Sequence, residues 1–265
     1  MNYRDFQELI WQKADELYRD MPWRQRTDPY WVLVSELMLQ QTQVDRVIPK
    51  FEAFMQTFPT LKTLAEAPLS AVLAQWNGLG YNRRAKFLHV TAQKVMTDFG
   101  GSIPNTYTDL ITLSGIGPNT AGAILNYSYN VPTVFIETNV RTVYFHHFYQ
   151  DSQSVSDAEL KVLVEATIDQ EHPREWYWAL MDYGSYLKRH GAGSIDKSAH
   201  YKKQAPLKGS LREVRGVIIH SLASGDREID ALRQDLPQDE RFERALADLK
   251  AEGLVQQTGS LLHLP

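Results

Sequence analysis

Apolar residues recur at helical spacing along most of the chain. Phe6, Ile10 and Leu17 predict a first helix, because side chains three to four positions apart share one helical face. The same spacing predicts further helices over residues 32–41, 44–58, 69–76, 83–99, 157–169 and 176–187. No alternation of apolar and polar positions predicts strands before residue 205. We therefore expect an all-α core of two lobes with a cleft.

The pattern changes after residue 209. Three short helices are predicted over residues 211–222, 229–236 and 241–252, followed by a hairpin over 254–262, an order typical of a winged helix. The third of these helices carries more acids than bases, which makes it a poor major-groove reader. We expect a structural or protein-contact role for this segment, with accessory DNA binding as the alternative. The expected domains are a core (1–187), a basic linker (188–209) and a winged-helix-like domain (210–265).

A glycine motif separates two predicted helices at residues 114–118, with the sequence SGIGP. Gly115 and Gly117 are expected to adopt backbone conformations that a Cβ would obstruct, and Pro118 with Thr120 marks the first turn of the next helix. Amide groups at such a helix start can donate to a phosphate oxygen. We interpret the motif as a helix–hairpin–helix clamp for the DNA backbone. An ordinary turn with a capping glycine is the alternative.

An acid follows the next apolar run. Residues 131–136 are expected to be buried, and Glu137-Thr138-Asn139 comes directly after them. A buried carboxylate without a fixed partner is unfavourable and is more often functional than structural. Glu137 is therefore a candidate catalytic residue.

These motifs carry a resemblance to a known family. The segment LSGIGPNTA, followed by the acid and NVR, resembles the helix–hairpin–helix (HhH-GPD) superfamily of DNA glycosylases. The segments WVLVSELMLQQTQV (31–44) and NGLGY (77–81) resemble the MutY-type adenine DNA glycosylases, and the likeness extends from about residue 21 to 187. It implies a base-excision repair enzyme that removes adenine opposite 8-oxoguanine or guanine in double-stranded DNA.

Two carboxylates fit that chemistry. Breaking an N-glycosidic bond requires protonation of the leaving base and stabilisation of the positive charge on the sugar. Glu36 lies in an otherwise apolar helix, where desolvation is expected to raise its pKa, and the resemblance implies that it protonates N7 of adenine; a solvent-facing glutamate is the alternative. The resemblance implies that Glu137 stabilises the sugar cation, although the family has aspartate there. It further implies that Asn139 bonds the sugar-phosphate or water.

Other roles follow from the resemblance alone. Relatives that also cut the strand carry a lysine amine where this chain has Asn119, which implies a monofunctional glycosylase. The residues expected to contact DNA are Gln41, Leu79, Tyr81, Gly115, Gly117, Asn119 and Thr120. Those at positions 41, 79 and 81 would wedge into the base stack or touch the opposite base. Trp23 and Arg24 match the wall of the base pocket, and Asp182 matches an acid that meets the flipped purine.

Composition limits the cofactors and partners. The chain contains no cysteine, so it has no disulfide and no cysteine-ligated cluster, whereas most family members bind a four-iron cluster after the position of Leu187. We expect no cofactor and no metal. The net charge is −4, so DNA binding must depend on local clusters. One basic cluster comprises Lys188, Arg189, His190, Lys197, His200, Lys202, Lys203 and Lys208.

No leader and no long apolar run is evident, so we expect a cytoplasmic monomer without a membrane contact. The resemblance implies a C-terminal domain that checks for 8-oxoguanine, and we expect the winged-helix segment to take its place here. Two alternatives remain open. One is a uracil or thymine mismatch glycosylase of the same superfamily, and the other is a catalytically silent protein that binds damaged DNA.

Overall fold

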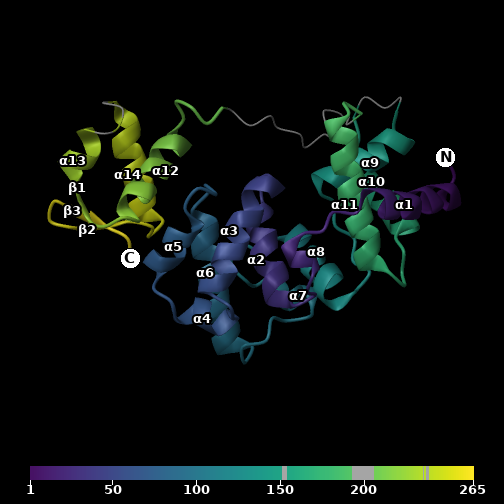
Figure 1. Ribbon diagram of the computed structural model, residues 1–265, viewed down its shortest axis with the longest axis horizontal. Coiled ribbons are helices and arrows are strands. Elements are labelled where there is room, and N and C mark those ends of the chain that lie inside the picture. Colours follow the sequence, from purple (N-terminus) through teal and green to yellow (C-terminus); the bar gives the residue numbers. More distant parts are fainter. Residues whose placement is uncertain (151–153, 193–205, 235, 237–238) are drawn as a thin grey trace. The chain divides into compact units, whose positions relative to one another are not determined.

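The computed structural model describes residues 1–150, 154–192, 206–234, 236 and 239–265, and it is mainly helical (Figure 1). The chain forms two compact units. Unit 1 comprises Met1–Val32, Asn105–Thr112 and Ile116–Lys203, and unit 2 comprises Leu33–Pro104, Leu113–Gly115 and Gln204–Pro265. Helix α2 (Pro29–Leu39) begins in unit 1 and continues into unit 2. The expected all-α class is confirmed.

Unit 1 is built around α11 (Pro173–Arg189), against which α1 (Tyr3–Leu17) and α9 (Thr138–Phe148) pack. Its core is aromatic: the ring of Phe6 lies 5.0 Å from that of Tyr144 and 6.1 Å from that of Trp176. The remaining elements of this unit are the 3₁₀ helix η1 (Pro22–Arg24), α7 (Tyr107–Leu110), α8 (Pro118–Tyr129) and α10 (Asp157–Thr167).

The helices of unit 2 pack around α6 (Arg83–Asp98), which contacts α4 (Leu61–Glu66) and α5 (Leu69–Trp76), while α3 (Val44–Thr57) packs on α5. Trp76 at the end of α5 is fully buried, and its ring lies 6.2 Å from that of Phe54. This packing fixes the turn between α5 and α6, residues 77–82, which carries two of the predicted DNA contacts.

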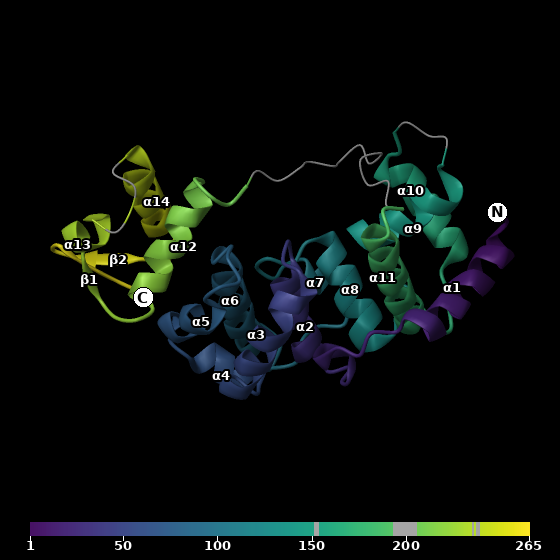
Figure 2. The same cartoon turned by 45° about the horizontal axis from the view of Figure 1, so that its top comes forward.

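Residues 210–265, called the wing below, form α12 (Leu211–Leu222), α13 (Ile229–Gln234) and α14 (Glu240–Ala251) with a small sheet (Figure 2). The sheet has the order β1-β3-β2, formed by Arg227–Glu228, Leu261–His263 and Gln256–Thr258, and both pairings are antiparallel. The winged-helix expectation is confirmed. Strand β1 was not predicted, because two residues are too short to show a period in sequence.

The wing belongs to the same compact unit as residues 33–104. The Ser70 amide donates to the carbonyl of Pro265 at 2.8 Å, and Asn77 Nδ2 lies 2.6 Å from His220 Nδ1. The three-part division of the sequence stays a prediction, and most of its linker lies outside the described residues. Within the described part of the chain, none of the helices has the length and apolarity needed to cross a membrane.

Candidate DNA-binding and catalytic residues

The two glycines of the hairpin differ in whether their backbone angles and surroundings require glycine. Gly115 has φ +77°, and a Cβ there would lie 2.8 Å from Cβ of Phe87, so only glycine fits. Gly117 has φ −91° and ψ −179°, which any residue adopts, and nothing among the described residues lies within 4 Å of a Cβ built there. The expectation that a Cβ would be obstructed is therefore confirmed for Gly115 and wrong for Gly117.

Gly117 is the N-cap residue of α8 and gives that helix no side-chain cap. Its carbonyl accepts from the amide of Ala121 at 2.9 Å, so the helix begins here in regular form. The first amides of an uncapped helix are the groups that bind anions such as phosphate. Thr120, by contrast, is 9% exposed and is mainly part of the packing of unit 1.

Asn119 joins the start of α8 to the residue before the candidate acid. Its Nδ2 donates to the Ile136 carbonyl at 3.0 Å, and the Ile136 amide donates to its Oδ1 at 3.3 Å. The side chain therefore holds a backbone segment within unit 1. A contact of Asn119 with DNA stays a prediction.

Glu137 is the N-cap residue of α9, and its carbonyl accepts from the amide of Arg141 at 2.9 Å. Burial raises the pKa of Glu137, and the positive charges of Arg141 and Lys188 only partly oppose that shift. Desolvation, with the charge of Arg19, lowers the pKa of Lys188. Glu137 is partly buried, and its neighbours are cationic. The expected burial of the run before it is confirmed only for Phe135 and Ile136, because Val131 and Pro132 are exposed.

Asn139 lies in the first turn of α9, and its Nδ2 contacts Sδ of Met181 at 3.6 Å. Its buried Oδ1 has no hydrogen-bond partner among the described residues. The close packing of α9 on α11 depends on Gly184, since a Cβ there would lie 2.4 Å from the Asn139 carbonyl oxygen. An unpaired buried acceptor two residues after Glu137 is a suitable partner for a water or a sugar hydroxyl.

Glu36 lies on α2 in unit 2. Among residues 32–38, all of which the structure describes, Glu36 alone is partly exposed and the others are buried. A carboxyl group that opens to solvent from an apolar helix suits the predicted proton donor, and that role stays a prediction.

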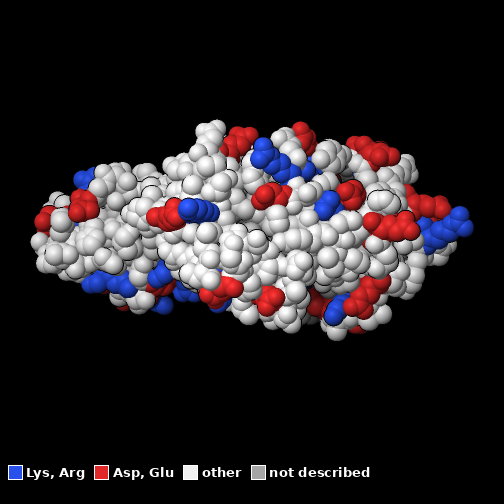
Figure 3. Space-filling model, turned by 90° about the horizontal axis from the view of Figure 1, so that it is seen from below, with Lys and Arg blue, Asp and Glu red and all other residues white. Residues whose placement is uncertain are grey.

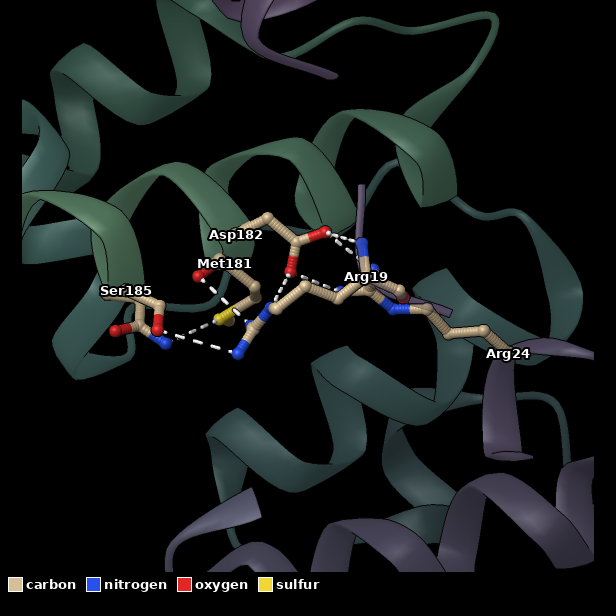
Figure 4. Close-up of polar contacts among 6 residues, drawn as sticks. Arg19, Arg24, Met181, Asp182 and Ser185 are labelled. Carbon is tan, nitrogen blue, oxygen red and sulfur yellow. Dashed lines mark hydrogen bonds and ion pairs between the residues drawn. The ribbon is translucent and has the colours of Figure 1, made fainter. Parts of the chain in front are cut away.

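The three base-pocket residues lie together in unit 1, where Trp23, Arg24 and Asp182 are all buried. Arg24 Nη1 donates to Asp182 Oδ2 at 2.6 Å, and Nη2 donates to Oδ1 at 3.0 Å (Figure 4). Arg19 adds a bond from Nε to Oδ1 at 2.6 Å. The Asp182 carboxylate thus accepts hydrogen bonds from two guanidinium groups. Its contact with a flipped purine stays a prediction.

Gln41 and Tyr81 share an unusual backbone conformation. Their φ angles are +56° and +48°, in the left-handed region that residues other than glycine rarely adopt. Both side chains are exposed, whereas Leu79 is 3% exposed and lies in the core. Strained residues persist where the surroundings hold them, often at binding sites. Insertion of Leu79 between bases would require this turn to open.

Arg84, which was not among the predicted site residues, binds the backbone beside both strained positions. Its Nη1 donates to the carbonyls of Leu37, Met38 and Gln40 at 2.7, 2.8 and 2.6 Å. Its Nη2 donates to Thr42 Oγ1 and to the carbonyls of Leu79 and Gly80 at 3.0, 3.3 and 3.1 Å. The guanidinium therefore caps the C-terminus of α2 and ties it to the α5–α6 turn.

The predicted basic cluster is only partly visible. Lys188, Arg189, His190 and Lys208 are described and exposed, whereas Lys197, His200, Lys202 and Lys203 lie outside the described residues. On the face drawn in Figure 3, lysine and arginine side chains are interspersed with aspartate and glutamate, which agrees with the net charge of −4.

The family's iron–sulfur cluster does not fit this chain. Such a cluster needs cysteine thiolates, and the chain has no cysteine. No group of three or more histidine, aspartate or glutamate side chains in the described part of the chain could hold a metal ion instead.

The fold and these motifs define a helix–hairpin–helix DNA repair protein. Residues 34–166 match the HhH-GPD superfamily of base excision DNA repair proteins, and the chain belongs to that superfamily. It is 31% identical over 265 residues to the adenine DNA glycosylase of Mycolicibacterium smegmatis, which covers 92% of this chain and 90% of that protein.

Further relatives match over a shorter stretch. The adenine DNA glycosylase of Buchnera aphidicola subsp. Baizongia pistaciae is 35% identical over 173 residues, and the human one is 36% identical over 183 residues. Each match covers 64% of this chain, but only 48% of the Buchnera protein and 34% of the human one. The chain thus spans about half the length of the Buchnera relative.

Solved structures share the fold. A thermostable thymine-DNA glycosylase superposes with a TM-score of 0.63 at 23% identity, covering 69% of this chain and 86% of that one. Endonuclease III in a trapped covalent intermediate with DNA gives a TM-score of 0.56 at 16% identity, covering 79% and 93%. At these identities the likeness concerns the fold alone.

Proposed function

We propose that this protein is a monofunctional adenine DNA glycosylase. It hydrolyses the N-glycosidic bond of adenine opposite 8-oxoguanine or guanine in double-stranded DNA, acts inside the cell as a monomer, and leaves an abasic site. The match to the M. smegmatis adenine DNA glycosylase over most of both chains supports the choice of adenine. The likeness to the thymine-DNA glycosylase is weaker support for a pyrimidine, since it concerns only the fold.

The observation that carries this proposal is the Glu137 carboxyl group at the start of α9. It is partly buried, burial raises its pKa against the charges of nearby Arg141 and Lys188, and Asn139 two residues later has an unpaired acceptor oxygen among the described residues. A carboxylate held in a low-dielectric site stabilises a nearby cation far better than one in water. This is the electrostatic group that an oxocarbenium-like sugar requires.

The two carboxyl groups divide the reaction. Glu36 gives its proton to N7 of adenine, and the base then leaves with the electron pair of the glycosidic bond. Glu137 stabilises the positive charge left on the sugar. Water adds to C1′ of the sugar and transfers a proton to Glu36, so the acid is regenerated. The products are free adenine and an intact strand with an abasic site.

Water is the nucleophile because the site offers no amine at the expected place. Asn119, at the position of the lysine in strand-cutting relatives, is an amide and is bonded to the backbone of Ile136. We therefore expect borohydride to trap no covalent protein–DNA complex. Efficient trapping would exclude the monofunctional mechanism and indicate Schiff-base chemistry from another lysine.

The substrate is tested by single-turnover assays on a panel of duplexes. Adenine opposite 8-oxoguanine, adenine opposite guanine, and thymine and uracil opposite guanine are compared under one salt condition. Release of adenine alone supports the proposal, and release of thymine or uracil identifies a pyrimidine glycosylase. Binding without any base release identifies the catalytically silent alternative.

Variants then assign the roles. Glu36→Gln and Glu137→Gln should each lower the rate of base release by about 10² or more, with little loss of DNA binding, because each removes one catalytic group. Glu137→Asp restores the family residue at constant charge. Slower release by Glu137→Asp would show that the backbone is adapted to glutamate. Equal rates for glutamate, glutamine and aspartate would exclude this carboxyl group from the chemistry.

A further inference from the structure

Polar contacts join the end of α14 in the wing to the start of α6 in the core of unit 2. The carboxylate of Glu252, the C-cap residue of α14, accepts from Arg83 Nη2 at 2.9 Å, and the Glu252 carbonyl accepts from Lys86 Nζ at 2.6 Å. Arg215 of α12 binds the same carboxylate at 2.6 Å from within the wing. We call these four residues the Glu252 cluster. It links a cationic surface of the core to an acid of the wing.

Glu252 is unfavourably placed for α14 itself. The C-terminal end of a helix carries a partial negative charge, so an acid there is destabilising and a cation is stabilising. Gly253, which follows Glu252 at φ +62°, leaves room for the core cation, since a Cβ there would lie 2.7 Å from Lys86 Nζ. The helix alone does not explain an acid at this position. Its partners on the core do.

The ion pair between the wing and the core is of a kind that breaks easily. The side chains of Arg83 and Glu252 are 56% and 18% exposed, and ion pairs so close to solvent contribute little to stability. The wing also has an apolar interior of its own, because α12 and α14 pack on each other and bury Ile218, Phe242 and Leu249. Separation of the wing from α6 would break polar contacts and leave that interior in place.

The core half of the Glu252 cluster adjoins the predicted DNA contacts. Arg83 comes two residues after Tyr81, and Lys86 lies one helical turn further along α6. A pocket of about 370 Å³ is lined by Gln41 and Tyr81 on the core side and by residues of α12 on the wing side. Arg212 of α12 donates to the Tyr81 hydroxyl at 2.7 Å. The docked wing therefore lies against the turn that DNA is expected to contact.

We propose that Arg83 and Lys86 form a binding site for a phosphate of the DNA backbone, and that Glu252 occupies this site in the free protein. Carboxylate and phosphate oxygens are both anionic acceptors, and guanidinium and ammonium groups bind either. The docked wing and DNA then compete, so the wing inhibits binding until a phosphate displaces Glu252. The hydroxyl of Tyr81 is released in the same step. This inference rests on the proposed function only for DNA as the ligand.

The first test measures equilibrium binding, so it does not depend on base excision. Duplexes with a tetrahydrofuran abasic analogue are titrated with protein over a range of salt concentrations, and affinity is followed by fluorescence anisotropy. Glu252→Gln should bind about three- to fivefold more tightly than wild type at low salt, the scale of one exposed ion pair. The gain should shrink as salt screens that pair. Weaker binding by Glu252→Gln would show that the docked wing supports DNA binding and would overturn the proposal.

Glu243→Gln is the matched control for charge. It removes the same charge from an exposed position of α14, where Glu243 pairs with Arg233 inside the wing. At about 0.1 M salt, charges more than about 10 Å apart are largely screened, so this variant should bind DNA like wild type. An equal gain in both variants would show general repulsion of DNA by the acids of the wing and exclude competition for one site.

A double-mutant cycle with Arg83→Ala identifies the site. In the Glu252→Gln background this change removes mainly the phosphate contact, and binding should weaken about threefold or more. In the wild-type background it also removes a contact that holds the wing, so the loss should be smaller. Equal losses in the two backgrounds would mean that Arg83 does not bind both anions, and the proposal would fail.

A reversible cross-link tests movement of the wing directly. The chain has no cysteine, so Ser70→Cys with Pro265→Cys supplies one pair of thiols, at positions whose backbones are joined by a hydrogen bond of 2.8 Å. The oxidised protein should bind the duplex at least about threefold more weakly than the same protein after reduction. Equal affinity of the two forms would show that the wing need not move. A protein that shows the expected effects but releases no adenine would refute the proposed function and leave this inference standing.

Discussion

Arg24 holds Asp182 by two hydrogen bonds of 2.6 and 3.0 Å, and the side chains of the pair are 2% and 1% exposed. The guanidinium also lies 5.4 Å from the ring centroid of Trp178. Charges buried this deeply are tolerated only when paired, so the pair is part of the architecture that joins η1 to α11. A purine that enters this region meets a carboxylate already occupied by Arg24 and Arg19.

We therefore expect Asp182→Asn to destabilise the protein before it alters base choice. Removing one partner leaves the Arg24 charge buried without compensation, which typically costs about 3–5 kcal/mol. Urea unfolding at pH 7 measures this loss. Asp157→Asn is the matched control, because its pair with Arg141 is 15% and 40% exposed and should lose only about 1 kcal/mol or less. A small loss in Asp182→Asn would instead favour a purine contact as its main role.

The hairpin glycines give a second prediction, because their structural requirements differ. Gly115→Ala should lower Tm, since the new Cβ meets Phe87 at 2.8 Å in a backbone with φ +77°. Gly117→Ala should leave Tm nearly unchanged in the free protein. If the start of α8 approaches phosphate, Gly117→Ala should weaken binding to all duplexes alike, since backbone contacts carry no sequence information. Loss on one mismatch only would point to base reading by the hairpin.

The sequence predicts most helices of both units, because their apolar faces follow one period, but it does not predict α4 or α9. The sequence also predicts that position 115 needs glycine, because glycines directly before a helix indicate a tight turn. The prediction for Gly117 is wrong, because the motif does not indicate which of its glycines needs a positive φ. The backbone angle depends on the path of the chain, and sequence spacing does not give that path.

Residues that act through long-range contacts could not be found in this way. Arg84 looks like one more arginine at the start of a helix, yet it donates to backbone carbonyls 44 to 47 residues away. Arg212 lies 131 residues from Tyr81 in sequence. Only the folded chain shows such pairs.

Glu137 gives a prediction on pH and stability. Burial raises the pKa of Glu137 in the folded protein, so the ionised carboxylate disfavours folding. The stability linked to its proton is fully present below the unfolded-state pKa. That stability is lost as the pH rises through the folded-state pKa. Glu137→Gln should therefore raise Tm relative to wild type at pH 8, and the gap should narrow toward pH 5. Base release by wild type should fall as pH drops, because protonated Glu137 no longer stabilises a cation.

Glu159, also in unit 1, is a control whose pKa is shifted in the opposite direction. Hydrogen bonds from the Ser156 side chain and backbone lower the pKa of Glu159, so its charge stabilises the fold above the unfolded pKa. Glu159→Gln should leave Tm unchanged or lower it at pH 8, and it should not affect base release. A fall in Tm for Glu137→Gln at pH 8 would contradict a desolvated carboxylate.

Arg84 gives the last prediction. Burial lowers its pKa only to about 10, so the guanidinium is charged at neutral pH and donates to five carbonyls and one hydroxyl. Arg84→Lys keeps the charge but supplies three donors from one point, which leaves buried carbonyls without partners. We expect a loss of about 2–4 kcal/mol in urea unfolding, the scale for several unsatisfied buried groups. Arg83→Lys, at an exposed neighbouring position, should change stability by less than about 0.5 kcal/mol.

The same variant should affect function through Gln41 and Tyr81, since Arg84 joins the two backbone segments that carry them. At a temperature where Arg84→Lys remains folded, affinity for a tetrahydrofuran duplex should fall because both residues must be ordered again on binding. Single-turnover release of adenine at saturating protein should change less, because Glu36 and Glu137 are untouched. Equal losses in affinity and in saturating rate would mean that Arg84 supports α2 and Glu36 rather than the strained residues.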